Sequence, residues 1–559
     1  MPGIAVLVAL PLQLLWALVL ATGGGDLAAQ LAWAGFASRH PGSAYNLSWY
    51  GGAHPANYSL LTPHLMAVLG VRTVTVAAGV GAAWALGRLC VRGGVRWPVA
   101  VSVLGSLTLW CNTASGRTTF AVGVALGLVA LLYVRRRAGL AAGWAAAATA
   151  ASPVAGLFLV VGAAYGLGGR WRRAAALVVP PFVLVAVTTV LFPFTGEQPM
   201  PAGRLWVPLA ACAVLGCAGP RGRGLGVVRR AAAVYAAGVV LTFLVASPVG
   251  TNVERLVGVA GPPVLLAALA SVPVPVPRSR RAGAGARARA AVLAGALVFV
   301  SGWLADRTGD DLRVSTAVPA WAEHTDGVVA ALHRLGAGRT RVEVVPARDH
   351  REAVLLAPYV NLARGWNRQL DVERGRLFYG DGPTPAAYRA WLERWAVGLV
   401  VLHDGRPDGP AEAEAALVRR GAGRLEQVWR GTGWRIYRVR GAVPLVSAPG
   451  TVVRGDDASL VVRMPAAGSV TVRIAPSPWL RAGGGGCLRA EGGWTRLTVR
   501  RGGEYRLDAP YRLRPYGSCR LPGRGPRPTA PEPSPRSGRD PVRYAPARSG
   551  PVRPGPVRP

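Results

Sequence analysis

The sequence contains no lysine, so all 64 of its strongly basic side chains are arginine. Without lysine the chain cannot build a Walker-type phosphate-binding loop or form a Schiff base with a carbonyl substrate. The chain has only 27 acidic residues, so its formal net charge is +37. Such an excess of positive charge is typical of nucleic-acid-binding proteins. Much of the arginine, however, lies in short clusters between apolar runs, as in the cytoplasmic loops of membrane proteins. We therefore expect no nucleic-acid partner.

Carboxylates are almost absent from the first part of the chain. Asp26 is the only one between Met1 and Glu197. Divalent cations with oxygen ligands usually need several carboxylates, so we expect no metal site and no metal cofactor here. Ion-coupled transporters use acidic residues buried within their spans, and this region offers no such residues.

Long apolar runs, by contrast, fill roughly the first 305 residues. About 18 uncharged residues suffice to cross a bilayer. Five arginine clusters separate the runs, and if all five face the cytoplasm, an even number of spans lies between neighbouring clusters. This predicts a mostly α, multi-pass protein of a bacterial plasma membrane, with about eleven transmembrane helices, a cytoplasmic N-terminus and an extracytoplasmic C-terminal region. The expected spans are 4–21, 72–88, 98–113, 118–134, 139–150, 153–168, 174–192, 204–219, 231–247, 257–274 and 290–305.

Four regions follow from this pattern. Alternating helical and strand-like segments predict an external α/β domain, and short alternating runs between Gly/Pro turns predict a small β-sandwich. Cys487 and Cys519 both fall in the external part, where a disulfide is permitted, so they form a candidate pair. The expected regions are a transmembrane domain over 1–305 with a large first external loop over 23–63, an α/β domain over 306–442, a β-rich domain over 443–520 and a disordered Pro/Arg-rich tail over 521–559.

The first external loop holds unusual chemistry. Asp26 follows three glycines and opens a segment with Trp33 and Phe36 at helical spacing. One interpretation is structural: Asp26 caps a helix, and the aromatic side chains lie flat in the membrane interface. The other interpretation is a site, in which Asp26 is the catalytic carboxylate.

Two segments resemble the GT-C superfamily, membrane glycosyltransferases that use polyprenyl-phosphate sugars. They are "WYGGAHPANYSLLTPHLMAVLG" (49–70) and "SPVGTNVERLVGVAGPPVLL" (247–266). In that superfamily a span leads into a large first external loop, and an acidic residue at its start acts as general base or orients the acceptor. Asp26 matches this position. The resemblance implies a lipid-linked sugar donor and transfer at the outer face of the membrane to a polysaccharide or glycolipid of the cell envelope.

The chemistry assigns further roles. Arg255 and Arg117 are candidates for the lipid phosphate, because a guanidinium can contact two phosphate oxygens. Alternatively, Arg255 pairs with Glu254 or reaches to the interface. The expected substrate-binding residues are Trp49, Tyr50, His54, Tyr58 and Asn252, although the histidines could equally be ordinary loop residues.

Two other functions stay open at this point. The number of spans and the Pro/Gly interruptions would also suit a transporter or lipid flippase, although no internal repeat of the kind common in transporters is present. The chain could also be a non-catalytic envelope-assembly protein that binds through its external domain. Asp26 and the long first loop distinguish the enzyme from both.

Overall fold

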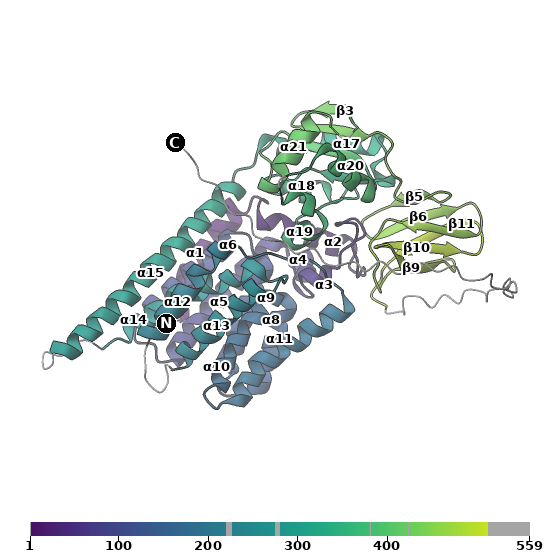
Figure 1. Cartoon of the computed structure of the whole chain (residues 1–559). Coiled ribbons are helices and arrows are strands. Elements are labelled where there is room, and N and C mark those ends of the chain that lie inside the picture. The colour runs from purple at the N-terminus through teal and green to yellow at the C-terminus, as the bar shows by residue number, and fades with distance from the viewer. Residues whose placement is uncertain (1, 220–225, 274–279, 381, 423, 513–559) are drawn as a thin grey trace, which may run out of the picture. The chain divides into compact units, whose positions relative to one another are not determined.

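The computed structural model describes residues 2–219, 226–273, 280–380, 382–422 and 424–512, and Figure 1 shows how their helices and strands are arranged. Helices fill the first part of the chain, and strands dominate the part that follows. Among the described residues, six helices are long and apolar enough to cross a membrane: Pro2–Leu20, Val71–Arg92, Trp171–Leu191, Gly226–Leu244, Gly250–Ala270 and Ala284–Ser315. They support a multi-pass membrane protein.

Five shorter apolar helices accompany these six. Helices suit a bilayer because each satisfies its own backbone hydrogen bonds. Every predicted span coincides with a helical segment, but five of them are short, so the number of crossings stays a prediction. The helices are α1 (Pro2–Leu15), continued by a π-helical turn (Trp16–Leu20), α5 (Val71–Arg92), α6 (Pro98–Ala114), α7 (Thr118–Tyr133), α8 (Ala138–Ala151), α9 (Pro153–Phe158), α10 (Ala163–Gly166), α11 (Trp171–Leu191), α12 (Trp206–Ala218), α13 (Gly226–Leu244), α14 (Arg255–Ala270) and α15 (Arg280–Ser315).

The arginine clusters meet at one end of the helices. Arg92 donates to the carbonyl of Leu132, beside the next cluster, and Arg173 donates to the carbonyl of Arg135. Arg289 likewise donates to the carbonyl of Gly219 at 3.1 Å. This grouping agrees with clusters that face a single side of a membrane.

Helix α15 runs past the predicted boundary at residue 306. Asp306, Arg307, Asp310 and Asp311 all lie within it, and it ends at Ser315. Charged side chains do not break a helix, and the next proline is Pro319. The α/β region therefore begins after α15, with α16 (Ala320–Glu323).

The α/β region is built on a four-stranded sheet of order β1-β2-β4-β3. β1 and β2 pair in parallel, and the other pairs are antiparallel. Helical and strand segments alternate in this region, as the sequence predicts. The elements are α17 (Asp326–Arg334), β1 (Arg341–Val344), α18 (Arg351–Leu356), α19 (Arg368–Arg374), α20 (Pro385–Arg394), β2 (Val397–His403), α21 (Glu412–Arg419), β3 (Leu425–Gly431) and β4 (Trp434–Val439).

Two further sheets, of order β7-β10-β9 and β5-β6-β11-β8, form the β-rich region. Cys487 begins β9, but Cys519 and the tail over 521–559 lie outside the described residues, so the disulfide and the disorder stay predictions. The strands are β5 (Thr451–Gly455), β6 (Ser459–Met464), β7 (Gly468–Val472), β8 (Arg481–Ala482), β9 (Cys487–Glu491), β10 (Trp494–Val499) and β11 (Gly503–Asp508).

The first loop contributes to the cores of both regions. It forms α2 (Asp26–Arg39), α3 (Pro55–Tyr58) and α4 (Thr62–Leu69). Trp33 and Phe36 are 2% exposed and belong to a hydrophobic cluster with residues of the α/β sheet. Tyr45 packs instead among residues of the β-rich region. The expectation of an interfacial aromatic belt is therefore wrong, because protein rather than lipid covers these rings.

Candidate functional site

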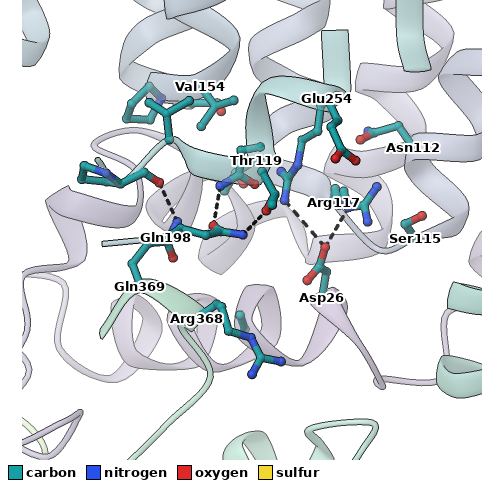
Figure 2. Close-up of a pocket in the computed structure, with 18 of the residues that line it drawn as sticks. Asp26, Asn112, Ser115, Arg117, Thr119, Val154, Gln198, Glu254, Arg368 and Gln369 are labelled. Carbon is teal, nitrogen blue, oxygen red and sulfur yellow. Dashed lines mark hydrogen bonds and ion pairs between the residues drawn. The ribbon is translucent and has the colours of Figure 1, made fainter. Parts of the chain in front are cut away.

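A cavity of about 680 Å³ lies where membrane helices meet the first loop and α19 (Figure 2). Asp26 and Tyr58 reach it from the first loop, Asn252 from the 3₁₀ turn Gly250–Glu254, and Arg255 from the start of α14. Arg117 reaches it from the turn between α6 and α7. The cavity thus unites five residues from four separate segments of the chain.

A tight glycine segment positions Asp26. Gly25 has a φ of +65°, a left-handed conformation that suits glycine. At Gly24, a Cβ atom would lie 2.8 Å from the carbonyl oxygen of Ser315, so a larger residue would push the end of α15 away. The backbone amide of Gly25 donates to the carbonyl of Asp349 at 2.7 Å. These contacts fix the first residue of α2 against the α/β region.

Arg351 holds the same corner together. Its side chain is 5% exposed and donates to both oxygens of Thr22, to the carbonyls of Ser315 and Ala317, and to Asp349. One guanidinium therefore connects the end of the first span, the end of α15 and the α/β region, all next to Asp26.

Asp26 is enclosed by cations rather than acting as a helix cap. Its Oδ2 accepts a hydrogen bond from Arg117 Nε at 2.7 Å and lies 3.9 Å from Arg255 Nη2. Arg117 also donates to Asp311 on α15 at 3.0 Å. Burial alone would raise the pKa of Asp26, but the guanidinium groups of Arg117 and Arg255 outweigh it and hold this pKa below its usual range. Asp26 is therefore ionised at neutral pH.

The cavity carries more positive than negative charge. Five arginines and three carboxylates line it, a formal excess of two positive charges. Glu254 is paired with Arg204 at 3.1 Å, so the predicted alternative of a Glu254–Arg255 pair is not present. Within the described part of the chain, Arg255 and Arg307 donate no hydrogen bond to a protein acceptor; their guanidinium groups lie over the rings of Phe120 and Trp303. Such cations suit an anionic ligand.

Polar side chains form the neighbouring wall. Gln30 donates to the hydroxyl of Tyr58 and accepts from the amide of Thr119 at 3.3 Å. Asn252 donates to Gln198 Oε1 at 2.8 Å. These groups supply donors and acceptors of the kind that bind hydroxyl groups.

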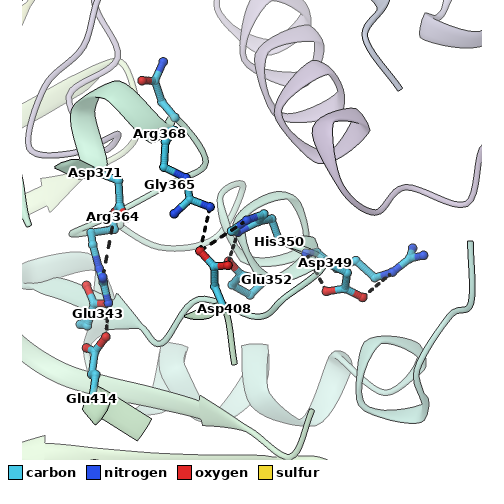
Figure 3. A network of polar contacts seen from close by, with 12 residues as sticks. Glu343, Asp349, His350, Glu352, Arg364, Gly365, Arg368, Asp371, Asp408 and Glu414 are labelled. Atoms are coloured by element: carbon cyan, nitrogen blue, oxygen red, sulfur yellow. Dashed lines mark hydrogen bonds and ion pairs between the residues drawn. The ribbon is translucent and has the colours of Figure 1, made fainter. Parts of the chain in front are cut away.

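A buried ionic network stands behind Arg368, the arginine that α19 contributes to the cavity (Figure 3). Arg368 contacts Asp408 at 2.9 Å and donates to the hydroxyl of Tyr379 at 2.8 Å. Tyr379 donates in turn to Asp371 at 2.6 Å, and Asp371 lies 4.0 Å from Arg364. The network restricts Arg368 to one orientation.

Arg364 lies between two buried glutamates. It donates to Glu343 at 2.8 Å and also to Glu414, and all three side chains are at most 2% exposed. Burial raises the pKa of Glu343 well above its usual range, although Arg364 opposes this shift. Because breaking a buried ion pair is costly, this cluster keeps the structure behind Arg368 rigid.

Three predicted substrate-binding residues do not line this cavity. Trp49 is 2% exposed, and its ring packs 5.3 Å from that of Trp33. Tyr50 is fully buried and donates to the carbonyl of Gly365 at 2.9 Å. His54 is hydrogen-bonded to the carbonyl of Ala44 at 3.0 Å, and burial lowers its pKa to about 4. Their aromatic and imidazole groups hold the first loop in place.

Five of the charged residues that line the cavity were not predicted from the sequence: Arg204, Glu254, Arg307, Asp311 and Arg368. Asp311 lay beyond the predicted end of the last span, where an ordinary soluble segment was expected. A predicted helix that continued past Ala305 would have placed Asp311 beside the cavity. The charged residues after Ala305 instead indicated that the helix ended there.

One group outside the cavity has ligand atoms close enough for a metal ion. The side chains of His40, Asp456 and Asp457 approach within 4.8 Å of one another. Arg39 already contacts Asp457 at 2.6 Å, and Asp456 accepts from two backbone amides of the following turn. Both carboxylates thus already have partners, and none of the three residues lines the cavity.

Comparisons with known proteins describe parts of the chain. A family model described as a domain of unknown function, DUF8823, matches residues 447–523, within the β-rich region and just beyond it. No curated protein sequence matches the chain. A similar solved structure is that of the arabinofuranosyltransferase AftD from mycobacteria, determined by single-particle cryo-electron microscopy. It has a TM-score of 0.44 and 18% sequence identity, over 78% of this chain and 40% of that one. The chain thus spans about two fifths of the length of the solved protein to which it is similar.

Proposed function

We propose that the protein is a membrane glycosyltransferase that moves a sugar from a polyprenyl-phosphate carrier to a cell-envelope acceptor at the outer face of the membrane. The observation that carries this proposal is the position of Asp26. It is an ionised carboxylate in a cavity of about 680 Å³, hydrogen-bonded to Arg117 and 3.9 Å from Arg255. A base lies next to cations at the boundary between apolar helices and a polar region.

The transfer needs both kinds of group. An acceptor hydroxyl oxygen attacks the anomeric carbon and forms the new glycosidic bond, while the bond from that carbon to the phosphate oxygen breaks. Polyprenyl phosphate leaves with the electron pair, and the hydroxyl proton passes to Asp26. Arg255 and Arg307, which have no protein acceptor among the described residues, stabilise the negative charge on the departing phosphate. Arg117 orients Asp26.

A phosphate in the cavity would also make Asp26 a better base. The low pKa of Asp26 results from Arg117 and Arg255. The phosphodiester of the bound donor is a monoanion; when it lies near these guanidinium groups, it offsets part of their positive charge and so raises the pKa of Asp26. The donor thereby prepares the carboxylate to accept the proton only when the reaction can proceed.

Asp26→Asn tests the assignment, because it keeps the shape and the contact with Arg117 but cannot accept the proton. The purified protein is incubated in lipid nanodiscs with polyprenyl-phosphate pentoses and hexoses and short oligosaccharide acceptors, and released polyprenyl phosphate is measured. We expect a loss of about 100-fold or more. Asp310→Asn is the matched control, since Asp310 is exposed and its one ion pair within the described part of the chain is with Arg313 on its own helix. Full activity in Asp26→Asn, or an equal loss in both variants, would overturn the assignment.

A further inference from the structure

A second cavity, of about 420 Å³, adjoins the first. Asn57, Tyr58, Phe194 and Asn367 line both of them. Its other walls come from the first loop, the segment after α11, α19, the end of α20, the segment after β7 and the β9–β10 hairpin. A volume of this size is within the range of roughly 300–1,000 Å³ of small-molecule sites.

Four tryptophans line this cavity: Trp33, Trp391, Trp395 and Trp494. Trp33 stacks with Tyr58 on the side of the first loop, with ring centroids 6.0 Å apart. On another side, Trp395 and Trp494 meet edge to face at 5.2 Å. Gly492 and Gly493, with φ of +58° and +84°, form the tight hairpin turn that brings Trp494 to the cavity.

A buried arginine fixes two of these rings. Arg341 is completely buried, and its guanidinium lies 5.9 Å from the ring centroid of Trp395 and 5.8 Å from that of Trp494. It also donates to the carbonyls of Trp395 and Arg473, which belong to different regions of the chain. The aromatic wall is thus prearranged.

Polar groups are placed between the rings. Glu373 accepts from Thr195 with one carboxylate oxygen, whereas its other oxygen is buried and has no hydrogen-bond partner among the described residues. The indole nitrogen of Trp33 is likewise buried without a hydrogen-bond partner among the described residues. Buried polar atoms without partners are uncommon in folded proteins. Arg394 and Thr195 line the cavity and are exposed, so the cavity opens to solvent where these two residues lie.

We infer that this second cavity binds the saccharide end of the acceptor, an inference that rests on the proposed function. Sugar rings present C–H groups on their faces, which pack on aromatic rings, and hydroxyl groups at their edges, which need hydrogen-bonding partners. The cavity offers both aromatic rings and polar groups. A hydroxyl group passes from it along Tyr58 and Asn367 into the first cavity, where Asp26 lies.

The test measures binding separately from transfer. Short manno-, galacto-, gluco- and arabino-oligosaccharides are titrated into the full chain in nanodiscs without donor, and saturation-transfer difference NMR reports binding. Trp494→Ala and Arg394→Ala should each weaken binding, about tenfold for the loss of the tryptophan face. Matched controls are Trp429→Ala, a half-buried tryptophan on β3, and Arg376→Ala, an exposed arginine of the same region, since neither residue lines the cavity. Asp26→Asn should bind as the wild type does.

Several results would overturn the inference: no oligosaccharide binds, the two cavity variants bind as the controls do, or they raise the KM for the donor rather than for the acceptor. The proposed function fails separately. If the wild type binds oligosaccharides but releases no polyprenyl phosphate, the saccharide site remains and the transferase does not. If transfer occurs but Trp494→Ala and Arg394→Ala leave the KM for the acceptor unchanged, the proposed transferase function remains and the saccharide site does not.

Discussion

Arg351→Met should loosen the corner at which the candidate site is built. The variant removes a buried guanidinium that donates to Thr22, Ser315, Ala317 and Asp349, and it leaves the Asp349 carboxylate without its cation. Breaking a buried ion pair costs about 3–5 kcal/mol. At an unfolding entropy of about 2.1 cal/mol/K per residue, a unit of roughly 500 residues loses about 1 kcal/mol per degree, so Tm should fall by about 3–5 °C.

Thermal unfolding of the purified protein in nanodiscs measures this change. Arg348→Met is the matched control, because Arg348 lies three residues earlier and is exposed. Arg351→Lys should recover only part of the loss, since an ammonium group cannot reproduce the planar fork of hydrogen bonds. Glycosyl transfer should fall together with Tm, because Gly25 and Asp26 lose their anchor. If Arg351→Met melted at the same temperature as Arg348→Met, the reasoning from this contact would be refuted.

Two further predictions concern pH. Arg117 and Arg255 hold the pKa of Asp26 low, so transfer should persist at acidic pH until the pH falls through that lowered value. Arg255→Gln should move the acidic limb of the pH–rate profile to higher pH. Arg204→Gln should leave this limb in place, because Arg204 pairs with Glu254. A limb that stays fixed in Arg255→Gln excludes Asp26 as the titrating base. Because the pKa of Glu343 is raised in the folded protein, its contribution to stability is complete below the ordinary glutamate range and is lost as pH rises through the raised value. Glu343→Gln should therefore flatten the decline of Tm with rising pH, and an unchanged decline would contradict the role given to its burial.

Apolar runs and arginine clusters were enough to predict the positions of the helices, because backbone hydrogen bonding in a bilayer leaves few alternatives. Asp26, Arg117 and Arg255, the candidate residues for catalysis and phosphate binding, lie next to one another in the structure, and each follows or precedes a span on the same predicted side. The aromatic residues of the first loop were more difficult. Trp49 and Tyr50 have the composition of a sugar site, yet the α/β region covers them, and no local pattern reveals a partner more than 250 residues away.

The second cavity also depends on contacts between residues far apart in the sequence. Trp395 and Trp494 belong to separate segments, and only Arg341 and the hairpin turn bring them together. Periodicity identifies the elements that carry such residues. It does not identify which side chains meet once those elements pack against one another.

The length of α15 determines how deep in the membrane the reaction would take place. The helix has 36 residues, or about 54 Å at 1.5 Å per residue, which exceeds a hydrocarbon core of about 30 Å. Its uncharged part over 290–305 accounts for about 24 Å, and Asp311 lies about 9 Å farther along. If this part crosses the bilayer, the Asp311–Arg117 pair lies at the level of the lipid head groups. A carrier could then present its phosphate to the arginines while its prenyl chain stays among the acyl chains, and the acceptor would have to come down to the membrane surface. Bilayers of different thickness should therefore change the rate of transfer even when every residue of the protein is the same.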